Sequence, residues 1–138
     1  MSGPARPEAR VGDELPPLTV EITTGLIVAG AIASRDYQDV HHDPGLARAR
    51  GARDVFMNIL TTNGFVGRFV TDWAGPDAIL KKVSLSLGAP NYPGDTMRMT
   101  GRVTAVEGDE VDVEVRGAND LGEHVSAKVH LTFAAGAA

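Results

Sequence analysis

The sequence has no cysteine among its 138 residues. Disulfide bonds, thiolate catalysis and zinc sites built from cysteine are therefore excluded. Long apolar runs are also missing, because the longest, Leu26–Ala33, is far shorter than the roughly 20 residues of a membrane-spanning helix. The N-terminus lacks the basic stretch followed by an apolar one that marks a secretory signal. We therefore expect a cytoplasmic protein that has no membrane partner.

Basic residues are also fewer than acidic ones, with 13 lysines and arginines against 18 aspartates and glutamates and a formal net charge of −5. This balance argues against nucleic acid as the main partner. Basic residues do cluster locally, at Arg48, Arg50 and Arg53 and again at Lys81 and Lys82. Such clusters are usually solvated faces, and the sharper alternative is a site for the phosphates of a carrier such as coenzyme A.

The length and the hydrophobic content of 43% predict one domain with one core. Residues 1–10 are rich in proline, alanine and charge, which predicts a disordered tail. We expect the folded domain to cover residues 11–134 and the last residues, 135–138, to be flexible.

Two helices and a strand are predicted in the first half of this domain. A strand is expected over residues 18–22, a helix over about 25–34 and a short helix over 46–50. The helix at 25–34 is apolar almost all round, so we expect it to be buried or nearly so.

A longer helix is predicted over residues 56–69 from apolar residues at helical spacing. Gly64 and Gly67 interrupt it, although glycine costs about 0.5–1 kcal/mol relative to alanine inside a helix. We interpret both glycines as a flat face that lets the helix lie tight against a sheet.

The second half changes to a period of two, which is typical of strands with one buried face. Turn residues at 107–109 and 119–122 separate neighbouring runs. The expected strands are 83–87, 97–106, 111–115 and 125–133. One strand, a helical block and four antiparallel strands predict an α+β fold.

The segment from Ser34 to Pro44 carries the most chemistry. Asp36 and His41 lie five positions apart in a polar, turn-prone stretch, and a carboxylate beside an imidazole can move protons on and off water near neutral pH. The structural alternatives are that Asp36 braces the loop backbone and that His41 is a hydrogen-bonded structural histidine. His42 is expected to be structural or exposed.

A metal site in this segment is disfavoured. The side chains of the adjacent residues His41, His42 and Asp43 diverge, and a further ligand is not evident. We expect no metal and no cofactor.

Three motifs, in order, resemble the MaoC-like (R)-specific enoyl-CoA hydratases, which have the hot-dog fold. Residues 11–16 read Val-Gly-Asp-Glu-Leu-Pro, residues 34–43 read Ser-Arg-Asp-Tyr-Gln-Asp-Val-His-His-Asp, and residues 90–96 read Pro-Asn-Tyr-Pro-Gly-Asp-Thr. The second run matches the family signature Ser-Gly-Asp-x-Asn-Pro-(Ile/Leu)-His-x-Asp. The resemblance implies a single hot-dog domain, with an antiparallel sheet wrapped around a long central helix, and it assigns catalysis to Asp36 and His41.

The chain departs from the family at three places. Arg35 replaces the glycine of the signature, and residues 38–39 read Gln-Asp instead of Asn-Pro. Residues 56–59 read Phe-Met-Asn-Ile, where many members have Ala-His-Gly-Met. This variant is similar to the small catalytic subunit of actinobacterial steroid side-chain enoyl-CoA hydratases, in which two unlike MaoC-like chains pair. The resemblance implies a bulky polycyclic acyl-CoA substrate and a hetero-oligomer with a second MaoC-like chain; a homodimer is the alternative.

The altered segment supplies the expected substrate contacts. Backbone N–H groups around Met57 and Asn58 are expected to hold the thioester oxygen, and Phe56 and Phe65 to shape the acyl pocket. The candidate substrate-binding residues come from this segment, from the rest of the helix predicted over residues 56–69 and from the arginine cluster at 48–53. The set is Phe56, Met57, Asn58, Asn63 and Arg53. As alternatives, Asn58 is a helix cap and Asn63 a polar residue of the core.

Two other functions stay open at this point. A hot-dog acyl-CoA thioesterase also binds acyl-CoA and uses a carboxylate, and a non-catalytic hot-dog chain only completes the pocket of a partner. The Asp36/His41 pair favours hydration by this chain itself.

Overall fold

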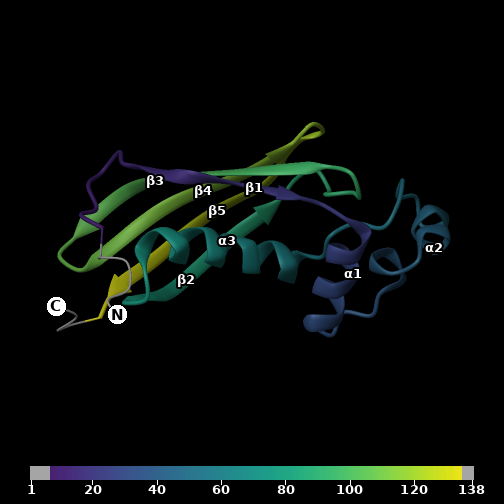
Figure 1. Ribbon diagram of the computed structural model, residues 1–138, viewed down its shortest axis with the longest axis horizontal. Coiled ribbons are helices and arrows are strands. Elements are labelled where there is room, and N and C mark those ends of the chain that lie inside the picture. Colours follow the sequence, from purple (N-terminus) through teal and green to yellow (C-terminus); the bar gives the residue numbers. More distant parts are fainter. Residues whose placement is uncertain (1–6, 135–138) are drawn as a thin grey trace.

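The computed structural model describes residues 7–134 as an antiparallel sheet with helices on one side. The strand order in the sheet is β1-β3-β4-β5-β2. Helix α3 runs along one face of the sheet, and α1, the 3-10 turn η1 and α2 lie beyond its N-terminal end (Figure 1). The elements are β1 Glu14–Glu21, α1 Thr24–Ala33, η1 Asp39–His41, α2 Pro44–Ala49, α3 Ile59–Ala74, β2 Ala78–Leu87, β3 Thr96–Glu107, β4 Glu110–Asn119 and β5 Gly122–Phe133. The predicted α+β architecture is confirmed.

The core fills the space between α3 and the sheet. Alternate residues of the inner strands, such as Met99, Val113 and Val129, point inward and are almost fully buried. They pack in one cluster with α3 residues that include Val66 and Phe69, because α3 presents one apolar stripe to the sheet. The helix therefore stays fixed to the sheet, and its N-terminus is held in place at one end of the domain.

Strand β1 starts four residues earlier than predicted. Strand β1 contains Pro16 and Pro17, and proline usually argues against a strand. However, β1 is an edge strand, and its pairing with β3 is interrupted between Leu15 and Leu18. Proline is tolerated at such positions because no ladder hydrogen bond is lost.

Helix α3 begins three residues later than predicted and extends to Ala74. The side chain of Asn58 caps its first turn, accepting a hydrogen bond from the Thr61 N–H. Gly75, with φ of 85°, ends the helix. Phe56 therefore belongs to the extended segment before α3.

The predicted role of the two α3 glycines is wrong. A Cβ at Gly64 would meet nothing within 4 Å, and one at Gly67 would make only an ordinary contact of 3.5 Å with Leu80. Close approaches that require glycine occur elsewhere, on α1, where a Cβ at Gly30 would overlap the side chain of Thr61, and on β3, where a Cβ at Gly101 would come within 2.7 Å of the Phe69 ring of α3.

Helix α1 is also less buried than its apolar sequence predicted. Only Ile27 and Ala31 are buried, and Ile32 is 52% exposed. Ile59 and Leu60, in the first turn of α3, are exposed to a similar degree. An apolar face is therefore open at this end of the domain.

The ends of the chain were predicted to be disordered. Residues 1–6 and 135–138 lie outside the described residues. Residues 7–10 have no helix or strand, yet Ala9 packs against the core and the Arg10 N–H bonds to Asp13. Within residues 7–134, no helix combines the length and the apolar character needed to cross a membrane.

Candidate active site

Asp36 is placed by the way α1 ends. The N–H of Arg35 donates to the Ile32 carbonyl and the N–H of Asp36 to the Ala31 carbonyl, the two bonds of a Schellman motif. This motif needs a left-handed residue, and Arg35 supplies it with φ of 56°. The position where the family signature has glycine is thus one that favours glycine, and it turns the chain so that Asp36 leaves the helix end.

His41 is placed by η1 and by the segment before α3. Its Nδ1 lies 2.6 Å from the carbonyl oxygen of Phe56. A carbonyl only accepts, so Nδ1 carries the hydrogen and donates it. The Phe56 ring meets the imidazole edge-on, with ring centres 5.0 Å apart. In the neutral ring this leaves Nε2 as an acceptor, with its orientation fixed from two sides.

The predicted pair comes together. Nε2 of His41 lies 3.3 Å from Oδ2 of Asp36, and the His41 side chain is almost fully buried while that of Asp36 is partly exposed. When His41 is neutral, two acceptor atoms face one another across this distance. The arrangement therefore suits a donor group that bonds to both, or a proton shared between them.

The pKa of Asp36 lies below its usual value. Desolvation by burial acts in the opposite direction and is the largest single influence, but several groups together outweigh it. The Asn58 side chain and the Gln38 N–H donate hydrogen bonds to the carboxylate, and His41 and His42 add favourable charge interactions. Asp36 is consequently a carboxylate at neutral pH.

His42 and Asp43 have structural roles. Nε2 of His42 lies 2.7 Å from the backbone carbonyl of Asp36 and donates to it. Asp43 caps α2 by accepting from the Leu46 N–H. Among residues 7–134 there is no group of three or more histidine, aspartate and glutamate side chains that could hold a metal ion.

One of the two expected oxyanion donors is already used. The Met57 N–H donates to the Asn91 carbonyl at 3.1 Å, and the Met57 side chain is buried against Asn91. The prediction that Met57 contacts substrate through its N–H is therefore wrong. Within the described residues the Asn58 N–H has no protein acceptor, as expected for a helix N-terminus.

Two other predicted contacts, Asn63 and Arg53, have surroundings of their own. Asn63 is exposed on α3, so the alternative of a core polar residue is wrong for it. The guanidinium of Arg53 lies over the Tyr92 ring, 4.4 Å from its centre. Arg50 pairs with Asp39 at 3.2 Å, so part of the basic cluster is engaged within the chain.

A further buried polar group near this site is His124 of β5, which the sequence pattern does not distinguish from an ordinary strand residue. Its Nδ1 donates to the Ala89 carbonyl, and its Nε2 lies 2.8 Å from the Thr62 hydroxyl. Burial lowers the pKa of His124, although the bond to Ala89 acts to raise it. This neutral histidine ties β5 to the first turns of α3 and to the loop that holds Met57 through Asn91. Periodicity gave no signal, since His124 occupies an ordinary inward position.

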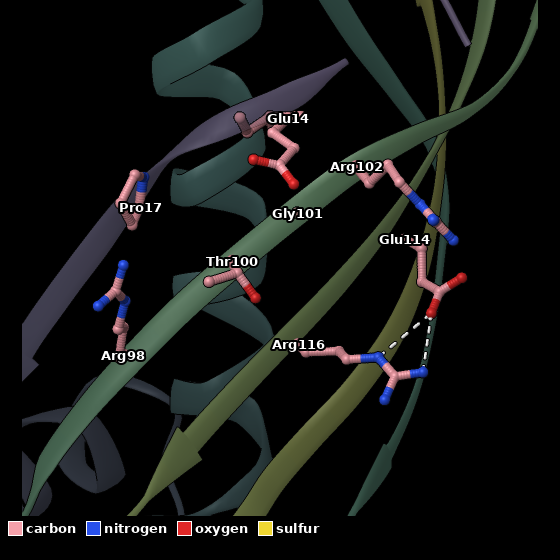
Figure 2. A pocket seen from close by; sticks show the side chains of 9 residues that line it. Glu14, Pro17, Arg98, Thr100, Gly101, Arg102, Glu114 and Arg116 are labelled. Carbon is pink, nitrogen blue, oxygen red and sulfur yellow. Dashed lines mark hydrogen bonds and ion pairs between the residues drawn. The ribbon is translucent and has the colours of Figure 1, made fainter. Parts of the chain in front are cut away.

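A different hollow lies on the face of the sheet away from α3 (Figure 2). Figure 2 shows three arginines around it, Arg98, Arg102 and Arg116, and the last is bonded to Glu114. Neither Asp36 nor His41 lines this hollow. The candidate active site is instead at the Asp36–His41 pair, in the segment that runs from the end of α1 into η1.

No protein-family model matches the chain. A curated relative, the 3-oxo-4,17-pregnadiene-20-carboxyl-CoA hydratase beta subunit of Mycobacterium tuberculosis, is 50% identical over 123 residues, covering 89% of this chain and 95% of that protein. The chain belongs to the MaoC-like hydratase family. The MaoC-like chain is also similar to a chain in the crystal structure of the ChsH1-ChsH2 complex from Mycobacterium tuberculosis, with 49% identity, a TM-score of 0.88, and coverage of 90% of this chain and 98% of that one.

More distant structures confirm the fold of this MaoC-like chain. The (R)-hydratase of A. caviae has a TM-score of 0.81 at 22% identity, covering 91% of this chain and 98% of that one. An (R)-hydratase of Pseudomonas aeruginosa has a TM-score of 0.84 at 19% identity, covering 92% of this chain and 83% of that one. The predicted hot-dog domain is confirmed.

Proposed function

We propose that this chain is an enoyl-CoA hydratase and the catalytic member of a pair of unlike MaoC-like chains. The observation that carries the proposal is the Asp36–His41 pair, 3.3 Å apart, with the histidine tautomer set by the Phe56 carbonyl. Both groups belong to this chain alone. A hot-dog chain that only completed the pocket of a partner would have no need of them.

The pair fits a single water molecule. A water that donates one hydrogen to Oδ2 of Asp36 and the other to Nε2 of His41 satisfies two acceptors that otherwise repel. Its oxygen attacks C3 of the enoyl thioester, and one O–H bond breaks as the C–O bond forms. Because the pKa of Asp36 is held low, Nε2 of His41 is the better acceptor for the proton. General bases of this kind contribute about 10²–10⁴-fold to the rate.

The electrons of the C2–C3 double bond move onto the thioester oxygen as the water adds. The Asn58 N–H at the start of α3 is placed to donate to this enolate oxygen, with support from the helix dipole. The proton on Nε2 then passes to C2, which restores the thioester carbonyl. Both new bonds form on the same face because a single pair delivers them.

An apolar groove beside the pair supports a bulky acyl group. The groove, about 350 Å³, runs between α1 and α3 and is lined by residues that include Leu26, Leu60 and Phe65. Ser34 also lines it, and the Ser34 hydroxyl oxygen accepts a hydrogen bond from Asn58. Phe65, which was expected from the sequence to shape the acyl pocket, lines this groove. We propose a polycyclic acyl-CoA from steroid side-chain breakdown as the substrate, and a cytoplasmic location in keeping with a CoA thioester.

The exposed apolar face supports a partner chain. Ile32 on α1 and Ile59 and Leu60 in the first turn of α3 are about half exposed, and Leu60 lines the groove. Burial of the exposed half of each would contribute about 0.8–1.5 kcal/mol. A second MaoC-like chain laid over α1 would cover them and close the groove. The similarity to a chain of the ChsH1-ChsH2 complex supports an unlike partner over a homodimer.

The test uses the chain purified together with a MaoC-like chain from the same organism that forms a complex with it. Incubation with a steroid side-chain enoyl-CoA should remove the enoyl thioester absorbance without releasing free thiol. Thiol release at the same rate would indicate a thioesterase and would contradict hydration. A matched incubation with a saturated acyl-CoA should show neither change.

A further inference from the structure

Asn58 is buried, with 2% of its surface exposed, and occupies the position of the glycine in the Ala-His-Gly-Met segment of the family. Its two amide hydrogens go to Ser34 Oγ at 2.9 Å and to Asp36 Oδ2 at 3.2 Å. Its carbonyl oxygen accepts from the N–H and the hydroxyl of Thr61. Every hydrogen-bonding position of the side chain is used within the protein.

The orientation of this amide is fixed by its partners. Reversing it would point the NH₂ group at the Thr61 N–H and the oxygen at the Asp36 carboxylate, which would place like with like on both sides. Thr61 is itself confined by Gly30, where a Cβ would overlap its side chain. A side chain so committed has no hydrogen left for substrate.

We propose that the Asn58 side chain is a positioning group for Asp36, holding the carboxylate oxygen that faces His41, and that contact of Asn58 with substrate is limited to its backbone N–H. This inference rests on the proposed function for its effect on rate. The bond goes to Oδ2, the oxygen that lies 3.3 Å from Nε2 of His41. The other oxygen, Oδ1, takes the Gln38 N–H, so the carboxylate is held at both atoms.

The second consequence concerns the charge state of the pair. A hydrogen bond donated to a carboxylate stabilises its ionised form. Asn58 thereby keeps Asp36 charged beside His41, and the charge stabilises the imidazolium that forms when His41 takes the water proton. The cost of misplacing such a group by about 1 Å is on the order of 10²-fold in rate.

The test compares Asn58→Ser with Asn58→Asp. Serine caps a helix about as well as asparagine, so it keeps the bond from Thr61 but removes the donor to Asp36. Aspartate keeps the size and the cap but sets a second carboxylate against the first. Asn63→Ser, the same change at an exposed position of the same helix, is the control.

Two measurements are made on the full chain with its partner. Carboxyl ¹³C NMR of labelled aspartate, assigned with Asp36→Asn, follows the titration of Asp36 directly. We expect the pKa of Asp36 to rise in Asn58→Ser and to rise further in Asn58→Asp, with no change in Asn63→Ser. In the hydration assay kcat should fall by about 10²-fold in Asn58→Ser with KM unchanged.

An unchanged Asp36 titration in Asn58→Ser would overturn the proposal, and so would a rise in KM with kcat retained, which indicates a substrate contact. If Asn58→Ser does not fold, Asn58→Thr takes its place, because threonine also caps a helix but lacks the amide donor to Asp36, and it should move the Asp36 titration in the same direction. The titration needs no substrate. A wild-type chain without hydratase activity would therefore refute the proposed function and leave the positioning of Asp36 to be decided by NMR.

Discussion

His41 presents its Nε2 to Oδ2 of Asp36 at 3.3 Å, while its Nδ1 donates to the carbonyl of Phe56. The second bond decides what the first contact can do, because it fixes which ring nitrogen has a free lone pair. Phe56 belongs to the segment in which this chain departs from its family, and it contacts His41 through both its backbone carbonyl and its ring. The carbonyl bond is independent of side-chain identity, so the departure leaves the tautomer of His41 unchanged.

Gly30 should tolerate no side chain. In Gly30→Ala the new Cβ would overlap Thr61 and displace the cap on Asn58, so we expect the free energy of unfolding in urea to fall by about 1–3 kcal/mol. Gly64→Ala is the matched control on the neighbouring helix. Its Cβ meets nothing, so stability should rise by about 0.5–1 kcal/mol. Equal stability of Gly30→Ala and wild type would refute the close packing of α1 on Thr61.

Arg35 should be strained by its left-handed backbone. This conformation destabilises the folded state by about 1–2 kcal/mol for an L-residue other than glycine. Glycine removes this strain, but its more flexible unfolded chain lowers the free energy of unfolding by about 0.5–1 kcal/mol. Arg35→Gly should therefore stabilise the protein by about 0.5–1 kcal/mol in urea unfolding. Arg35→Ala keeps the strain and should match wild type. A gain of the same size in Arg35→Ala would assign the effect to the arginine side chain.

His124 should make the protein less stable in mild acid. Its folded-state pKa lies below its usual value, so the unfolded chain takes up a proton near pH 6.5 that the folded chain does not. The free energy of unfolding should therefore fall as the pH drops below about 6.5. In urea titrations across this range, His124→Asn should show a shallower fall than wild type.

His130 provides the opposite control. The hydrogen bond that His130 donates to the Asp112 carboxylate raises the pKa of His130, so this histidine stabilises the fold at low pH and the contribution is lost as the pH rises through the folded-state pKa. His130→Asn should therefore make the fall in mild acid steeper. Identical pH profiles for His124→Asn and wild type would contradict the account of His124 as a neutral buried group.

The α1 face should carry the contact with the partner chain. Ile32→Asp places a charge at an exposed apolar position, so we expect the dissociation constant for the partner, measured by analytical ultracentrifugation, to rise by about tenfold or more. Leu121 is exposed to a similar degree in the turn between β4 and β5, and Leu121→Asp should leave association unchanged. Equal effects of the two changes would place the partner elsewhere.

The order of the elements and the meeting of Asp36 with His41 could be predicted from the sequence because both are local. Strand alternation has a period of two, and Asp36 and His41 lie within one short segment. The role of Asn58 could not, because its amide reaches Asp36 only after α1 ends in a Schellman turn and α3 packs beside it. Asn58 and Asp36 are 22 positions apart in the sequence, and this separation does not indicate how close their side chains lie in the fold.

The exposure of α1 illustrates a second limit. An apolar helix predicts burial, but Ile32 is half exposed in the single chain. The apolar sequence shows that the helix needs a covering surface. It does not show whether that surface belongs to this chain or to a partner chain. In β1, Pro16 and Pro17 are tolerated because the strand lies at the sheet edge and its pairing with β3 is interrupted there. Both conditions depend on the assembled sheet, so the local sequence does not reveal them.

The most direct test of the central claim is the hydration rate of the complex carrying Asp36→Asn or His41→Ala in this chain. Each change removes one acceptor for the water, so we expect kcat to fall by about 10²–10⁴-fold while the complex stays assembled. Asp39→Asn, three residues from Asp36 and paired with Arg50 at the surface, is the control and should keep wild-type activity. Full activity in Asp36→Asn or in His41→Ala would contradict catalysis by this pair.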